Sequence, residues 1–193
     1  ELLDEDGSLY TNLAETVRRN FIRFWYSPEG YCYDVVDGPD GHDATLRPNQ
    51  LLAVSLSYSP LPPDKQKVIV DVCTKHLLTS HGLRTLTQKD AHYVGQYVGD
   101  QKKRDEAYHQ GTVWGWLIGP FIAAHLRVYK DPDLASSYLR PALRHLRDHG
   151  LGSISEIFDG DAPFTPRGCT ADSGSVGEYL RSWCMIRKAR QNS

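Results

Sequence analysis

Residues 111–129, GTVWGWLIGPFIAAHLRVY, are nearly all apolar. If this stretch is a helix, its hydrophobic side chains lie on every side, and no face of the helix is polar. A helix that is apolar on all sides belongs in a protein core. Pro120 lacks a backbone N–H, so we expect it to kink or interrupt this helix. The stretch predicts a buried helix around which the rest of the chain packs.

Helical periodicity continues on both sides of this core stretch. Apolar residues recur every three or four positions, which is typical of amphipathic helices. Pro48 suits a first helical turn, and Gly150 suits the position after a helix end. We therefore expect no confident strand and five further helices, over residues 10–26, 47–58, 63–77, 133–148 and 171–188.

The connections between these helices alternate in length. Residues 27–46, 78–110 and 149–170 are long, whereas only a few residues follow the second and fourth helices. Short connections favour antiparallel neighbours, which places the three long connections at one end of the helices. Long loops in a compact domain are usually functional or disordered. These loops carry acids, amides, arginines and aromatic residues, so we expect a functional site at that end.

Composition excludes several classes of partner. The chain has 193 residues, with 24 acidic and 22 basic side chains, and we expect a single domain over 1–193. Without a basic stripe we expect no nucleic-acid partner, and without a long apolar run we expect no membrane partner. The four cysteines form no CxxC pair, which favours reduced thiols and a cytoplasmic location over disulfides.

The chain begins at Glu1, and Met185 is its only methionine. We therefore expect a processed product or a piece of a longer protein. Whether further polypeptide precedes Glu1 is left open by the sequence.

Other chemistries fit less well. The chain has no phosphate-binding loop of the G-x-x-x-x-G-K-[ST] type and no G-x-S-x-G nucleophile elbow. His145 and His149 are four residues apart, but Leu146 stands where a zinc protease needs glutamate, so we interpret them as histidines at the solvated end of a helix. We expect neither a metal nor a cofactor.

Four motifs together resemble one known family. They are LRPNQLLAVSL, GLRTL, AYHQGTVWGWLIGPFIAAHLRVY and GSISEIFDGDAPFTPRGC, and they occur in order between about Tyr10 and Trp183. The chain resembles the C-terminal catalytic domain of glycogen debranching enzymes, the amylo-alpha-1,6-glucosidase family. The resemblance implies an all-α fold, the (α/α)6 barrel. Because the periodicity predicts only about six helices, we expect a partial barrel that corresponds to its C-terminal half.

The resemblance also implies a chemistry, the inverting hydrolysis of α-1,6-glucosidic branch linkages in glycogen or another α-glucan. Inversion needs a general acid for the leaving oxygen and a general base for the attacking water. By its motif, Glu156 falls where the family carries the base. The family's acid is an aspartate upstream of this chain, and nothing in 1–193 matches its motif.

The family motifs also imply a sugar pocket. Structural roles remain the alternative: Arg47 as a loop salt bridge, His109 as a backbone hydrogen-bond donor, and Asp159 and Asp161 as turn residues that support Glu156. The residues expected to bind substrate are Arg47, Asn49, Gln50, Arg84, His109, Gln110 and Trp114, with Asp34 and Asp105 as weaker candidates.

Three positions depart from the family pattern. Asp172 replaces an amide, Gly174 replaces a tryptophan, and Gly115 replaces a proline. These changes suggest a pocket of altered shape. Three hypotheses follow: a piece of a glycosidase that supplies the base, a non-catalytic maltooligosaccharide-binding module, or an assembly fragment. The assembly fragment would pair with a second copy or with a missing N-terminal half.

Overall fold

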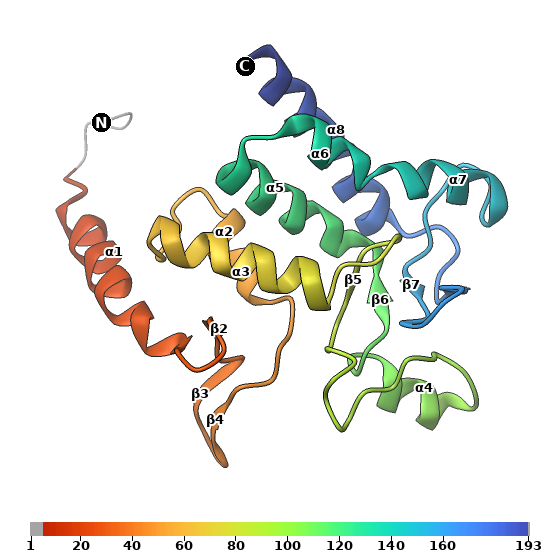
Figure 1. The fold of residues 1–193 in the computed structure, drawn as a ribbon, viewed down its shortest axis with the longest axis horizontal. Coiled ribbons are helices and arrows are strands. Elements are labelled where there is room, and N and C mark those ends of the chain that lie inside the picture. The colour runs from red at the N-terminus through yellow and green to blue at the C-terminus, as the bar shows by residue number, and fades with distance from the viewer. Residues whose placement is uncertain (1–5, 193) are drawn as a thin grey trace.

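The computed structural model describes residues 6–192, and about half of them are helical. Figure 1 shows most of the helices in the upper part of the molecule, with the small strands and the short helix over residues 101–107 below them. The α-helices are α1 (Ser8–Asn20), α2 (Gln50–Ser55), α3 (Pro63–His76), α4 (Gln101–Ala107), α5 (Ile118–Tyr129), α6 (Pro132–Ser137), α7 (Arg140–Asp148) and α8 (Ser173–Gln191).

Helix α5 is the core helix that the apolar stretch predicts. It packs against α2 and α3 on one side and α8 on the other (Figure 1). Phe121 and Ile122 are fully buried, and they meet Leu51 of α2, Ile69 of α3 and Ile186 of α8 in one hydrophobic core. The expected core helix is therefore confirmed, and its neighbours come from both ends of the chain.

The start of that core helix differs from the prediction. Val113–Trp114 form strand β6, Gly115–Leu117 form a short 3-10 helix, and only then does α5 begin. The expected kink is wrong because Pro120 lies in the first turn of α5, where a backbone N–H has no helical partner to lose.

Antiparallel strands correct the expectation of a strand-free, all-α chain. β1 (Trp25–Tyr26) pairs with β2 (Tyr31–Cys32), and β3 (Val35–Gly38) pairs with β4 (Gly41–Asp43). A separate four-stranded sheet has the order β5-β6-β7-β8, in which β5 is Leu83–Arg84, β7 is Ile157–Phe158 and β8 is Pro166–Arg167. Most of these strands have two residues, too few for an alternating pattern to register in sequence.

The sheet joins segments that are far apart in sequence. Leu83 pairs with Trp114, and Trp114 pairs with Ile157. The second and third long connections therefore meet beside the N-terminal end of α5, as their lengths predict. The helices and sheets give a mixed architecture, and the described residues do not by themselves close a barrel.

Helix α1 protrudes from the rest of the molecule (Figure 1). None of its residues is buried, and a 3-10 helix (Phe21–Phe24) connects it to the hairpin β1–β2. The predicted helix over 10–26 thus ends earlier than expected. Phe21, Phe24 and Trp25 follow α1 and pack against the hydrophobic core, whereas Leu13 and Val17 on α1 itself are more than half exposed.

Candidate functional site

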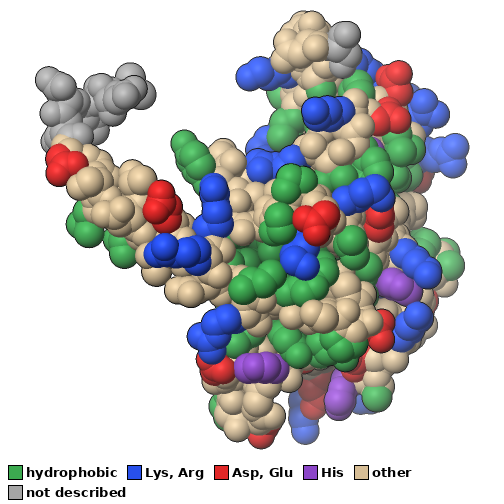
Figure 2. Space-filling view, turned by 60° about the vertical axis from the view of Figure 1, so that its left-hand side comes forward, with side chains coloured by type: hydrophobic (Ala, Val, Ile, Leu, Met, Phe, Trp, Pro, Cys, Tyr) green, Lys and Arg blue, Asp and Glu red, His purple; other side chains and the backbone are tan. Residues whose placement is uncertain are grey.

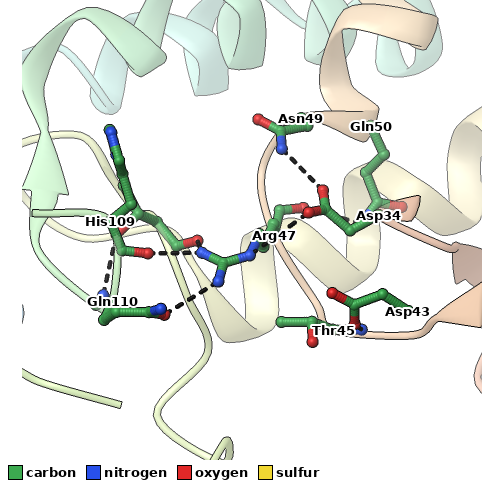
Figure 3. Close-up of polar contacts among 10 residues, drawn as sticks. Asp34, Asp43, Thr45, Arg47, Asn49, Gln50, His109 and Gln110 are labelled. Atoms are coloured by element: carbon green, nitrogen blue, oxygen red, sulfur yellow. Dashed lines mark hydrogen bonds and ion pairs between the residues drawn. The ribbon is translucent and has the colours of Figure 1, made fainter. Parts of the chain in front are cut away.

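Arg47 is the centre of the polar network drawn in Figure 3. Its Nη1 donates to the carbonyl oxygens of Thr85 (3.1 Å) and His109 (2.6 Å), and its Nη2 donates to Oε1 of Gln110 (3.0 Å). Its Nε lies 3.5 Å from Oδ2 of Asp34. The guanidinium therefore joins the first long connection to the second, so the loop-bridging alternative for Arg47 has direct support.

Asp34 and Asn49 extend this network toward solvent. The Asn49 side-chain amide donates to Oδ1 of Asp34 over 2.8 Å, and in Figure 3 its oxygen points away from that carboxylate. Gln50 is different because it is buried and both its groups bind backbone. Its Oε1 accepts from the Cys32 N–H and its Nε2 donates to the Arg47 carbonyl.

A pocket of about 490 Å³ opens beside the Arg47–Asp34 pair. Its aromatic wall is formed by the rings of Trp114 and His109, which stack with centroids 5.3 Å apart. An aromatic face opposite amide, carboxylate and guanidinium groups suits a neutral ligand rich in hydroxyls. The lining residues are Asp34, Arg47, Pro48, Asn49, Thr85, His109, Trp114, Trp116 and Leu117.

His109 is neutral on this wall at physiological pH. Partial burial, followed by the charge of Arg47, lowers the pKa of its imidazole. A neutral imidazole both donates and accepts a hydrogen bond, which suits hydroxyl recognition.

Glu156 lies in the loop before β7 and is half-buried. Its Oε1 accepts from the Tyr108 hydroxyl (3.2 Å), and its Oε2 accepts from the Cys169 N–H (2.9 Å). Its backbone is held as well, since its N–H donates to the Cys169 carbonyl and its carbonyl accepts from the Gly115 N–H. Each carboxylate oxygen therefore has one donor, and the residue is fixed at both side chain and main chain.

Tyr108 connects Glu156 to the pocket, and the sequence analysis did not identify it. Its carbonyl oxygen accepts from Nε1 of Trp114 over 3.1 Å, and its ring meets the Trp114 ring edge-on at 4.7 Å. Its position directly before His109 in the YHQG motif could have indicated a role. The helix before it, α4, is polar on all sides, so no apolar periodicity predicted this helix or the place of Tyr108 at its end.

Arg84 and Asp105 lie outside the pocket. Arg84 donates through Nε to the Gly160 carbonyl over 2.8 Å and lies near the Phe164 ring, so it supports the turn between β7 and β8. Asp105 is exposed on α4, one turn before Tyr108. The pocket lining thus includes Asp34, Arg47, Asn49, His109 and Trp114 among the residues predicted to bind substrate.

Asp159 and Asp161 fasten the Glu156 loop to its neighbours. Asp159 accepts from both Nε and Nη2 of Arg167 and from the Tyr97 N–H. Asp161 accepts from Gln88 and from the hydroxyl of Tyr93. These contacts fit the supporting role expected for the two aspartates.

Two of the three departures from the family pattern lie at the start of α8. Asp172 caps this helix by accepting from the Ser175 N–H. The atoms nearest to a Cβ at Gly174 would be those of the Asp172 carboxylate, at 3.3 Å or more. The third, Gly115, donates its N–H to the Glu156 carbonyl over 3.2 Å, a bond that proline could not make.

His145 is buried, which corrects the expectation that it lies at a solvated helix end. Its Nε2 accepts from the Ser155 N–H over 3.1 Å, directly before Glu156. Among residues 6–192 no group of His, Cys, Asp and Glu side chains is arranged to hold a metal ion. No helix in the same range has the length and hydropathy that crossing a membrane requires.

Comparison with known proteins gives two findings. A family model described as amylo-alpha-1,6-glucosidase matches residues 1–181. The glycogen debranching enzyme of Saccharomyces cerevisiae is 26% identical over 214 aligned residues, which cover 92% of this chain and 14% of the yeast protein. The chain thus spans about one seventh of that relative's length. The family match extends over most of the sequence, and this chain belongs to the amylo-alpha-1,6-glucosidase family.

Proposed function

We propose that this chain supplies the general base and part of the sugar pocket for hydrolysis of α-1,6-glucosidic branch linkages in glycogen or another α-glucan. The observation that carries the proposal is the position of Glu156. Tyr108 and Trp114 connect this fixed carboxylate to a pocket whose walls suit a sugar. Family membership supplies the reaction class.

In the proposed step, Glu156 takes a proton from a water molecule. The water oxygen bonds to C1 of the terminal glucose from the face opposite the leaving group, and the bond between C1 and the branch oxygen breaks. The leaving oxygen needs a proton from a general acid. We assign that acid to a residue outside 1–193, in a complete (α/α)6 barrel of which these helices form a part.

A cytoplasmic location belongs to the same proposal. Its support is that Cys32, Cys73, Cys169 and Cys184 are all free thiols in the structure.

Saccharide binding without turnover is the second candidate function. It is favoured by Arg47, whose guanidinium nitrogens already donate to protein acceptors. Asn49 and the aromatic wall then remain as the main ligand contacts. Calorimetry with maltooligosaccharides at low-millimolar concentration measures such binding. A binding module should release or absorb heat in this titration, whereas the assembly-fragment hypothesis does not require any binding.

Hydrolysis of α-glucosyl fluoride tests the proposed base without its acid. Fluoride leaves without being protonated, so the reaction needs only the pocket and a base for water. We expect the purified chain to release fluoride, Glu156→Gln to lose this activity, and a branched dextrin with single-glucose stubs to release no glucose.

Azide provides the matched control. This anion attacks C1 without a base, so it should restore fluoride release to Glu156→Ala and form a glucosyl azide. Fluoride release that survives in Glu156→Gln would refute the assignment of the base. Glucose release from the dextrin that disappears in Glu156→Gln would show that the acid lies within the chain.

A further inference from the structure

The Glu156 carboxylate is held by donors of two different kinds. On Oε2 the donor is the Cys169 N–H, at 2.9 Å. Gly168 permits this approach, since it has φ +65° and a Cβ at its position would lie 2.6 Å from Oε2. On Oε1 the donor is the Tyr108 hydroxyl, at 3.2 Å. Only this second donor is a side chain, so only this contact can be removed without changing the backbone.

Tyr108 is itself fixed by its surroundings. Its N–H donates to the Asp105 carbonyl at the end of α4. Its own carbonyl accepts from both Thr112 Oγ1 (2.8 Å) and Trp114 Nε1 (3.1 Å). Three hydrogen bonds hold the main chain of Tyr108, and its ring packs against Trp114. The Tyr108 side chain therefore loses little conformational entropy when its hydroxyl binds Glu156.

We infer that Tyr108 is a positioning residue for Glu156: its hydroxyl fixes the orientation of the carboxylate that activates water, and its contacts with Trp114 align that carboxylate with the pocket. This inference rests on the proposed function, because it treats Glu156 as a base. A carboxylate with one donor on each oxygen keeps further lone pairs available for water, and its plane is set by the two donors. A carboxylate held by the Cys169 N–H alone could rotate about its last bond.

The ionisation of Tyr108 agrees with this geometry. Partial burial and then the charge and hydrogen bond of Glu156 raise the pKa of the Tyr108 hydroxyl. The phenol therefore remains protonated, and remains a donor, throughout the neutral range.

The competing explanation is that Tyr108 only packs. Its ring contacts Trp114, His109 and Tyr97, and such contacts would survive loss of the hydroxyl. Substitution by phenylalanine distinguishes the two explanations because it removes the oxygen and keeps the ring.

The first experiment measures the contact without any activity. The pKa of Tyr108 is followed by NMR of ring-labelled tyrosine in the wild-type chain, in Glu156→Gln and in Glu106→Gln. Glu106 is an exposed carboxylate on α4 and controls for loss of a nearby charge. We expect the Tyr108 pKa to fall toward its ordinary value in Glu156→Gln and to change little in Glu106→Gln. Equal pKa values in the wild type and Glu156→Gln would overturn the inference.

The second experiment measures positioning, with α-glucosyl fluoride as substrate. Tyr108→Phe should lower kcat about tenfold with KM changed less than about twofold, as expected when an interaction that aligns the reacting group is lost. Tyr97→Phe is the matched control: its ring lies 5.9 Å from that of Tyr108, and we expect wild-type rates. An unchanged kcat in Tyr108→Phe, or a rise in KM alone, would show that Tyr108 only packs.

The two experiments separate the inference from the proposed function. A Tyr108 pKa that responds to Glu156→Gln, in a wild-type chain that releases no fluoride, would mean that the contact exists and that Glu156 is not a base. Fluoride release that depends on Glu156 and is insensitive to Tyr108→Phe would uphold the proposed function and refute the positioning role.

Discussion

At the scale of single residues, two neutral histidines lie beneath the Glu156 loop. The His81 ring stacks on Phe158 with centroids 4.6 Å apart and meets the His145 ring edge-on at 5.9 Å. His145 in turn accepts the Ser155 N–H, which requires an unprotonated Nε2. Protonation of these imidazoles should therefore weaken the packing beneath the loop that carries Glu156.

Acid should destabilise the fold through His81. Burial, and then the neighbouring His145, lower the pKa of His81 to about 4, whereas the unfolded chain titrates near 6.5. Between these values the unfolded state binds more protons, so the free energy of unfolding falls as the pH falls from about 6.5 to about 4. We expect His81 to contribute about 1–2 kcal/mol of this loss, allowing for its partial exposure.

Urea denaturation between pH 4.5 and 7.5 measures this loss. His81→Phe keeps an aromatic ring over Phe158 and should flatten the pH dependence. His92→Gln is the control, because the His92 side chain is 83% exposed. Identical slopes for the wild type and His81→Phe would contradict the prediction.

At the scale of elements, an ion pair between Asp159 and Arg167 helps to hold the β7–β8 turn. The Asp159 side chain is only 7% exposed and lies 2.9 Å from Nη2 of Arg167. Only the Asp159 side of this pair is buried, since the Arg167 side chain is 33% exposed. Neutralising Asp159 therefore costs its bonds to Arg167 and weakens its acceptance from the Tyr97 N–H, while water can still solvate the Arg167 charge.

Asp159→Asn should therefore lower the free energy of unfolding by about 1–3 kcal/mol. The control is Asp37→Asn, which breaks an exposed ion pair with Arg23 and should cost less than about 1 kcal/mol. Chemical denaturation compares the two variants, and faster amide exchange over 157–167 in Asp159→Asn alone would locate the effect. Equal losses of unfolding free energy in Asp159→Asn and Asp37→Asn would contradict this prediction.

Long apolar elements could be predicted from the sequence, whereas short or polar elements could not. The stretch around Phe121 predicted α5 because a helix that is buried on all sides is made almost entirely of apolar residues. Strands of two residues carry no period, so the sheet that joins Leu83, Trp114 and Ile157 was missed.

For the site, the motif resemblance predicted a sugar-binding role for Arg47, Asn49, His109 and Trp114. All four line one pocket in the structure, and their role in binding stays a prediction. It could not show that Gln50 is buried beneath them, because that depends on where the Cys32 N–H lies. The catalytic role of Glu156 stays a prediction.

At the scale of the whole molecule, α1 carries an apolar stripe that is largely exposed. Figure 2 shows hydrophobic side chains on the arm that α1 forms. Leu13 and Val17, one turn apart, are 53% and 57% exposed. An isolated helix of 13 residues is marginal in water. The expectation that this chain pairs with a second copy or with further polypeptide remains a prediction, and light scattering at high concentration tests the first case.

Polar substitution of this stripe should leave the stability of the folded body unchanged. We expect Leu13→Ser combined with Val17→Ser to alter the free energy of unfolding by less than about 1 kcal/mol. Leu51→Ala, at a fully buried position, should cost about 2–5 kcal/mol. Denaturation at micromolar concentration compares them, and a large loss in the α1 variant would mean that α1 is already covered in solution.

Residues 108–114 contact Glu156, the proposed base, at one end and form the pocket wall at the other, through Tyr108 and Trp114. The two ends share hydrogen bonds, so neither can be remodelled alone. A substitution that widens the pocket at Trp114 to admit a bulkier ligand would also release the Tyr108 carbonyl and disturb Glu156. If Glu156 is the base, changes of specificity should therefore arise more readily outside residues 108–114, where a substitution leaves the hydrogen bond between Tyr108 and Trp114 in place.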